Sequence, residues 1–79
     1  MTENRGRPTV MRVARERAGM SQEDLGHELR GLPSQPVVSA WERGLAPLPA
    51  KRRKEIARIL KVPADQLLVT WDDYLKAQV

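Results

Sequence analysis

Two glutamines, Gln22 and Gln35, carry the side chains in this sequence that are best suited to recognise a ligand. A carboxamide presents a donor and an acceptor side by side, which matches the edge that adenine shows in the DNA major groove. Each glutamine follows a serine, Ser21 or Ser34, of the type that caps helices. We therefore expect Gln35 to face bases from the first turn of a helix. Gln22 is expected at a helix start, where free N–H groups and the positive dipole end favour a phosphate. The alternative for both is a plain solvated side chain.

The pattern from Ser21 to Gly44 predicts two short helices joined by a tight connection. Asp24, three residues after the serine, completes a weak form of the capping box. Apolar residues recur at helical spacing on both sides of the connection, at Leu25, Leu29, Val38 and Trp41. This arrangement is the plan of a helix-turn-helix motif, whose second helix, here residues 34–43, enters the major groove while the first crosses the backbone.

The rest of the chain predicts helices that support this pair. Thr9 or Pro8 can open a first helix, because threonine caps helices and proline suits their first turn, and Gly19 ends this helix. The segment LAPLP is expected to stay extended until Pro49 starts a fourth helix. A short fifth helix is expected at about 63–68, and Thr70 can cap one more short segment. The further positions expected to be buried are Met11, Ala14, Ala18, Ile56, Ile59, Leu60, Leu67 and Leu68.

Length and composition limit the class of protein. The 79 residues make one small domain, and the absence of cysteine excludes a disulfide framework or a thiolate metal site. We predict an all-α protein, with a compact five-helix domain at 8–68 between a flexible basic arm at 1–7 and a helical tail at 69–79. No apolar run approaches the roughly 20 residues of a membrane span, so a cytoplasmic location is expected. His27 is the single histidine and lacks partners at ligand spacing, so we predict no metal, no cofactor and no enzymatic activity.

Positive charge is concentrated on either side of the helix pair. The formal net charge is +4 and the pI is near 10.1. Residues 1–20 hold five arginines against two glutamates, and residues 45–62 hold six cations against one glutamate. Residues 21–44 and 63–79 are each net negative by two. Two basic segments beside a reading helix suit a polyanionic partner, although a solvated basic face has the same composition.

A series of short motifs occurs in order between Met11 and Leu68. They are Arg15, Gly19-Met20-Ser21-Gln22, Leu25, Ser34-Gln35, Val38-Ser39, Trp41-Glu42-Arg43-Gly44, Ile56-Ala57 and Val62-Pro63-Ala64-Asp65-Gln66-Leu67-Leu68. Each motif is weak alone, but together the chain resembles the Xre/Cro-type helix-turn-helix family, which includes the phage repressors. The resemblance implies a sequence-specific regulator of transcription that binds double-stranded DNA.

The resemblance also implies roles for individual side chains. It makes Gln35 a base reader that often contacts Gln22, and it places backbone contacts at Arg43 and at the basic run from Lys51 to Arg53. Neutralising several phosphates predicts a steep salt dependence of binding. The full set of expected DNA contacts is Ser21, Gln22, Ser34, Gln35, Pro36, Val37, Ser39, Ala40, Arg43, Lys51, Arg52 and Arg53.

The expected reading face is chemically sparse. Pro36, Val37 and Ala40 have no side-chain donor, so their contacts with bases would be apolar ones with thymine methyl groups. Val37 is equally interpreted as half-buried core. The resemblance further predicts a partly buried ion pair between Arg15 and Glu42, which is structural and not a DNA contact.

The connection at residues 30–33 is longer than the common turn of the family. We expect either that the first helix of the pair runs about a residue further or that the loop bulges outward, with the second helix still in the groove. In the arm, Arg5 and Arg7 are candidates for an adjacent minor groove.

The tail leaves more than one function open. Its apolar members, Trp71, Tyr74 and Leu75, form either a homodimer patch, which we favour because operators are commonly two-fold symmetric, or filler packed on the first helix. The rival function is a protein-interaction module, antitoxin-like or recruiting another subunit through residues 69–79. A third hypothesis is a degenerate helix-turn-helix that only scaffolds.

Overall fold

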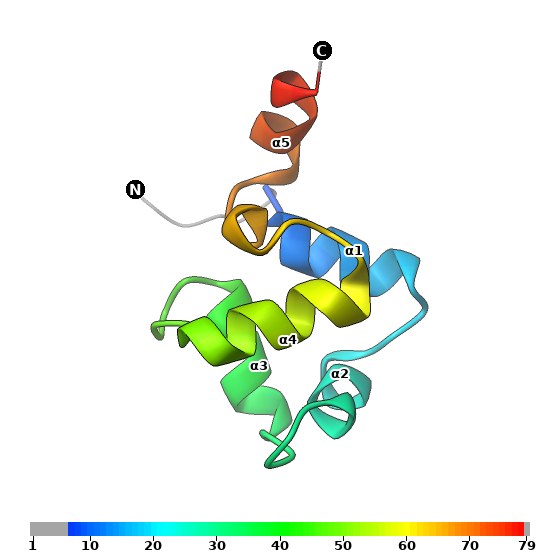
Figure 1. The fold of residues 1–79 in the computed structure, drawn as a ribbon, viewed down its shortest axis with the longest axis vertical. Coiled ribbons are helices and arrows are strands. Elements are labelled where there is room, and N and C mark those ends of the chain that lie inside the picture. The colour runs from blue at the N-terminus through cyan, green and yellow to red at the C-terminus, as the bar shows by residue number, and fades with distance from the viewer. Residues whose placement is uncertain (1–6, 79) are drawn as a thin grey trace.

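Residues 7–78 are described by a computed structural model, drawn in Figure 1. Every regular element within them is helical, which confirms the all-α prediction. The fifth expected helix is a single 3-10 turn, η1, and the extra C-terminal helix is α5. The elements are α1 (Val10–Arg17), α2 (Gln22–Glu28), α3 (Gln35–Glu42), α4 (Ala50–Leu60), η1 (Ala64–Gln66) and α5 (Trp71–Ala77).

Local caps determine where the helices begin. The Thr9 hydroxyl accepts from the third residue of its helix, and Ser21 and Asp24 exchange two hydrogen bonds of 2.9 Å. The Ser21 backbone N–H, followed by its hydroxyl, holds the pKa of the Asp24 carboxyl below its ordinary value. Ser34 precedes α3 but its side chain makes no capping hydrogen bond, contrary to expectation. The reason is that Pro36 lacks an N–H and the Val37 N–H is taken by the Ser34 carbonyl at 3.0 Å.

The core lies between α1, α2, α3 and α4. Ala18, expected inside, is exposed because α1 ends one residue earlier and Ala18 is its C-cap. Leu48 lies in the segment expected to be an extended linker, yet it is only 5% exposed. Ile59 and Leu68 are partly buried and pack against the core. The buried apolar residues are Val10, Met11, Ala14, Leu25, Leu29, Val38, Trp41, Leu48, Ile56, Ala57, Leu60 and Leu67.

The segment after η1 closes over the start of α1. The Val10 N–H donates to the Val69 carbonyl at 2.8 Å, and the Met11 N–H donates to the Leu67 carbonyl at 2.9 Å. In return the Trp71 N–H donates to the Pro8 carbonyl at 2.8 Å. These bonds satisfy N–H groups that a helix start leaves free, and they place α5 beyond α1 at one end of the molecule (Figure 1).

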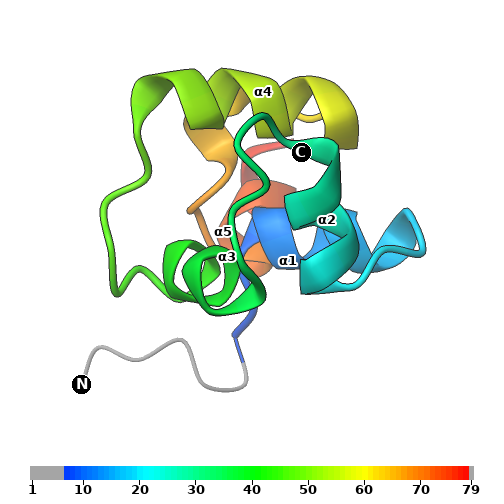
Figure 2. The same ribbon diagram turned by 90° about the horizontal axis from the view of Figure 1, so that it is seen from below.

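The connection between α2 and α3 forms a compact turn held by α4. Helix α2 ends at Glu28, so the expected extension of this helix is wrong. The chain then reverses through Gly31 and Leu32, whose φ angles are +81° and +47°. Seen from below in Figure 2, the turn crosses the front of the molecule between α4 and the start of α3.

Glu55 of α4 fastens this turn. Its carboxylate accepts from the Arg30 N–H at 3.1 Å and from the Arg52 guanidinium at 2.9 Å. The backbone bond from Arg30, with the smaller contribution of Arg52, holds the pKa of the Glu55 carboxyl below its ordinary value. At the other end of the turn, the Pro33 carbonyl lies so close to Gly26 that a Cβ there would be 2.3 Å from its oxygen. The longer turn is therefore fixed by two neighbouring helices.

Candidate nucleic-acid interface

The two glutamines that start α2 and α3 are in contact. Gln35 is exposed and its Nε2 donates to Oε1 of Gln22, which is half-buried. Nε2 of Gln22 in turn donates to Oε1 of Glu42 at 2.9 Å. The first contact lies on the surface and the second leads into the protein, so the exposed amide is connected to the interior.

Glu42 belongs to a buried ion pair. Nε of Arg15 donates to Oε2 of Glu42 at 2.6 Å, and the two side chains are only 8% and 2% exposed. The same guanidinium donates to the Met20 carbonyl at 2.6 Å. Within residues 7–78 no buried side-chain nitrogen or oxygen lacks a partner. The charges are therefore compensated, and both ends of the pair are fixed in orientation.

This network determines which way the amides point. A carboxylate such as Glu42 only accepts, so Gln22 must turn its NH₂ group inward and its oxygen toward Gln35. Gln35 must then give one N–H to that oxygen. Its second N–H and its own oxygen remain for a ligand. The exposed amide of Gln35 therefore presents one donor and one acceptor in a fixed orientation.

The remaining outward residues of α3 are small or apolar. Pro36 and Val37 are exposed, and Val37 has 40% of its surface in solvent, so it is not part of the buried core. Ser39 and Ala40 are half-exposed, and Arg43 is exposed directly after the helix. The opposite side of the helix holds the core residues Val38 and Trp41. Along α3, Gln35 and Arg43 are therefore the long polar side chains that reach solvent.

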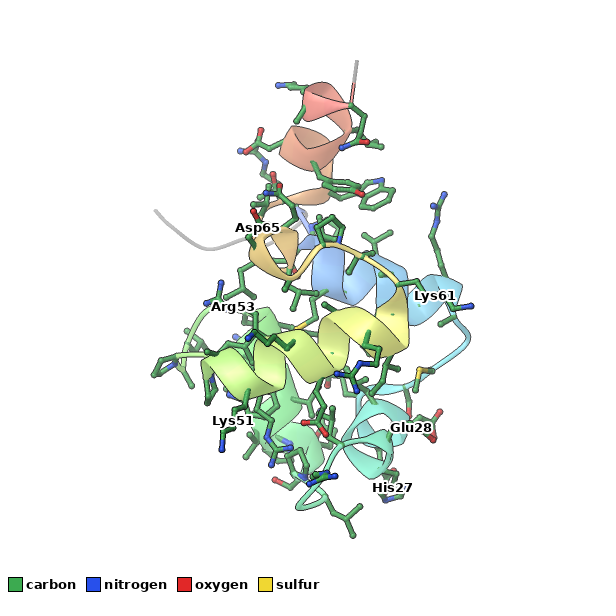
Figure 3. All side chains as sticks on the ribbon, viewed as in Figure 1. His27, Glu28, Lys51, Arg53, Lys61 and Asp65 are labelled. Atoms are coloured by element: carbon green, nitrogen blue, oxygen red, sulfur yellow. The ribbon has the colours of Figure 1, made fainter. Side chains whose placement is uncertain are left out.

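Cationic side chains gather at the amino end of α4. Figure 3 shows Lys51 and Arg53 there, whereas Lys61 lies at the far end of the same helix. Lys51 is exposed, and Arg52 and Arg53 are half-buried. The Arg52 guanidinium is held by Glu55, so part of its charge is compensated. Lys51 is consequently the cation of this run that is freest to meet a polyanion.

Two further expectations concern the arm and the histidine. Arg5 lies outside the described residues, and Arg7 is exposed. His27 and Glu28 project from the outer side of α2 (Figure 3), and His27 is exposed. Among residues 7–78 no group of three or more metal-ligating side chains is brought together.

No helix in this part of the chain has the length and apolar character needed to cross a bilayer.

Sequence reasoning missed two residues that shape this surface. In the sequence Glu55 contributes only a negative charge to the count, although a turn of unusual length needs support from outside and an acid on the neighbouring helix can provide it. Gly26 stands inside a helical pattern, and its lack of a Cβ is the signal that could indicate a close backbone approach. The bond between Gln22 and Glu42 joins residues far apart in the chain, so no local signal predicts it.

Two short helices joined by a turn, the second of which presents a fixed exposed amide, are the arrangement of a helix-turn-helix domain. A family model described as Helix-turn-helix matches residues 11–67, and the chain belongs to this family, of the Xre/Cro type. The family is one of DNA-binding regulators and not typically of enzymes. No curated protein and no solved structure matches the chain.

Proposed function

We propose that this protein is a sequence-specific regulator of transcription that reads double-stranded DNA with α3 in the major groove, as a homodimer on a two-fold symmetric operator. The observation that carries the proposal is the chain of contacts from buried Glu42 through Gln22 to exposed Gln35. Such an arrangement holds a base-reading group in place before DNA arrives, which lowers the cost of ordering it on binding.

Gln35 is proposed to read adenine. Its free N–H and oxygen match the N7 acceptor and the N6 donor of that base. Guanine presents two acceptors, N7 and O6, and Gln35 has only one uncommitted N–H while Gln22 holds the other. The oxygen of Gln35 would then oppose O6 of guanine. Discrimination of adenine from guanine at this position therefore follows from the orientation of the amide.

Most of the affinity is proposed to come from phosphates. Ser21 and Gln22 at the start of α2 and Ser34 at the start of α3 bring helix N-termini toward the backbone. Arg43 after α3 and the run from Lys51 to Arg53 add positive charge. The other contacts proposed along α3 are Pro36, Val37, Ser39 and Ala40. Because they offer little hydrogen bonding to bases, specificity is concentrated at Gln35.

The experiment is a duplex selection followed by binding measurements across salt concentrations. In Gln35→Ala the selected duplex is expected to lose its advantage over random duplex, with little change in salt slope. In Lys51→Ala both duplexes weaken together and the slope falls by about 0.9. Lys51 is preferred to Arg52 because truncating Arg52 also removes its bond to Glu55. Identical behaviour of the two variants would contradict these roles.

A second candidate function is interaction with another protein through the tail at 69–79. In that case the chain is an antitoxin-like partner or recruits another subunit. This function is favoured by one observation: Trp71 and Tyr74 of α5 are only partly covered and line a surface groove. Absence of any enriched duplex at low salt would favour this candidate over DNA reading.

A further inference from the structure

The exposed amide of Gln35 keeps one N–H and its oxygen for a base. Its other N–H is given to Oε1 of Gln22, and Nε2 of Gln22 is given to the buried carboxylate of Glu42. A carboxylate has no hydrogen to donate, so neither amide can reverse without losing a bond. In the proposed reading of adenine, the oxygen of Gln35 therefore accepts from the exocyclic N6 and its free N–H donates to N7.

The N6 amino group of adenine is also a position at which DNA can carry a methyl group. One of its two hydrogens pairs with thymine and the other faces the major groove. In a paired N6-methyladenine the methyl group takes the place of the groove-facing hydrogen, because the other hydrogen is needed for pairing. The oxygen of Gln35 then loses its donor and meets an apolar group, which leaves a polar atom without a partner at the interface.

The reading face is poorly suited to receive such a methyl group. Reversing the Gln35 amide would break its bond with Gln22 and point an N–H at the methyl group, which accepts no hydrogen bond. One turn further along the same side of α3 lies Ser39, a half-exposed polar residue. The exposed apolar residues Pro36 and Val37 are one and two positions from Gln35, so they do not share its side of the helix.

We propose that this protein distinguishes its operator from other DNA only while the adenine read by Gln35 is unmethylated at N6. The N6-methylation state of one base then controls occupancy of the operator. The proposal rests on the proposed reading of adenine by α3 and adds its regulation by a covalent mark on the DNA. Phosphate contacts do not depend on the base, so the affinity for the methylated operator approaches the affinity for random duplex.

Competition binding with singly modified duplexes tests the proposal on the full chain. In each half-site of the selected duplex, the adenine assigned to Gln35 is replaced by N6-methyladenine or, separately, by 7-deazaadenine, which keeps N6 but lacks the N7 acceptor. The control duplex carries N6-methyladenine outside the half-sites. The control protein is Gln35→Ala, which reveals any effect of the methyl group on the duplex itself. All affinities are measured at one salt concentration.

N6-methylation at the Gln35 position is expected to weaken binding of the wild type by roughly tenfold or more, the discrimination that a bidentate base contact provides. The 7-deazaadenine duplex should also bind the wild type more weakly, because the bond to N7 is lost. The control duplex should bind the wild type as well as the unmodified one, and Gln35→Ala should bind all of these duplexes almost equally.

Two outcomes would overturn the proposal while leaving base reading by Gln35 intact. In the first, the wild type prefers adenine to guanine at this position but binds the methylated duplex as tightly as the unmodified one, or more tightly. In the second, methylation weakens Gln35→Ala as much as it weakens the wild type. Failure of the proposed function is distinguishable, because then no A·T pair is read by the wild type and ignored by Gln35→Ala, and the proposal fails with it.

Discussion

At the scale of single residues, a buried carboxylate lies two hydrogen bonds from an exposed amide. Glu42 accepts from Gln22, and Gln22 accepts from Gln35. An isolated surface glutamine rotates and flips freely, so it offers two donors as readily as a donor and an acceptor. Because Glu42 fixes the orientation of Gln22, the bond between Gln22 and Gln35 removes that freedom from Gln35. We therefore expect the ion pair to affect recognition by fixing the orientation of the amides, without touching a ligand.

Gln22→Met tests this coupling. Methionine keeps the length of the side chain but makes no hydrogen bond with Gln35, whose NH₂ group is then free to turn. We expect the preference for adenine over guanine at the base pair read by Gln35 to fall by roughly tenfold, while discrimination at other positions persists. Competition binding with duplexes that differ at single positions measures this effect. Gln66→Met, a half-buried glutamine in η1, is the control; an equal loss there would argue against the coupling.

The ion pair itself is expected to matter most when half of it is removed. Glu42→Ala strands the Arg15 guanidinium inside the protein and should lower the free energy of unfolding by about 3 to 5 kcal/mol. The double variant Arg15→Met with Glu42→Leu removes both charges and should lose less. Urea unfolding measures the change in the free energy of unfolding for both variants, provided that their m-values equal that of the wild type. A double variant less stable than the single one would show that the stranded charge is not the cause.

At the scale of elements, the sequence predicts those features of a helix that depend on residues close to it in the chain, such as its start and its end. The cap at Ser21 and the stop at Gly19 depend on residues within one helical turn, and both are present. Leu48 is different, because a proline-rich segment looks like a linker and its burial depends on where α3 and α4 are packed. Ala18 has the spacing of a core residue but lies past the end of its helix. Burial set by neighbouring elements is not visible in a local pattern.

Gly26→Ala tests the close approach of the α2–α3 turn. Alanine favours a helix by about 1 kcal/mol over glycine. Its Cβ would nonetheless meet the Pro33 carbonyl oxygen, a backbone atom, at 2.3 Å. We expect a net loss of about 1 to 3 kcal/mol in the free energy of unfolding, from forced displacement of the turn. His27→Ala, at an exposed position of the same helix, is the control in urea unfolding. A stabilised Gly26→Ala variant would mean that the turn yields easily.

The turn is also expected to loosen in acid. The folded-state pKa of Glu55 is held below its ordinary value, chiefly by the Arg30 N–H. A depressed folded pKa contributes stability above the unfolded value of 4.5, and this contribution is lost as the pH falls through the folded pKa. In Glu55→Gln the decline of the melting temperature below about pH 4.5 should be shallower than in the wild type. If the melting temperatures of the two proteins decline equally in acid, Glu55 does not have this role.

At the scale of the whole molecule, α4 separates two surfaces. Its amino end carries Lys51 and Arg53, which are proposed to meet DNA, whereas Lys61 follows its carboxyl end (Figure 3), where the groove near α5 lies. The family and the all-α fold were predictable, because ordered motifs and helical spacing survive in one sequence. The groove was not, since it arises where α1 and α4 end beside a tail whose docking depends on backbone bonds to residues 8–11.

The most direct test of DNA reading by α3 is a double-mutant cycle between protein and duplex. The selected duplex is changed from A·T to G·C at the position assigned to Gln35, and binding is measured for the wild type and for Gln35→Ala at one salt concentration. The account predicts that the base change costs the wild type about 1 to 3 kcal/mol and costs the variant almost nothing. An equal cost in both proteins would show that another residue reads this base.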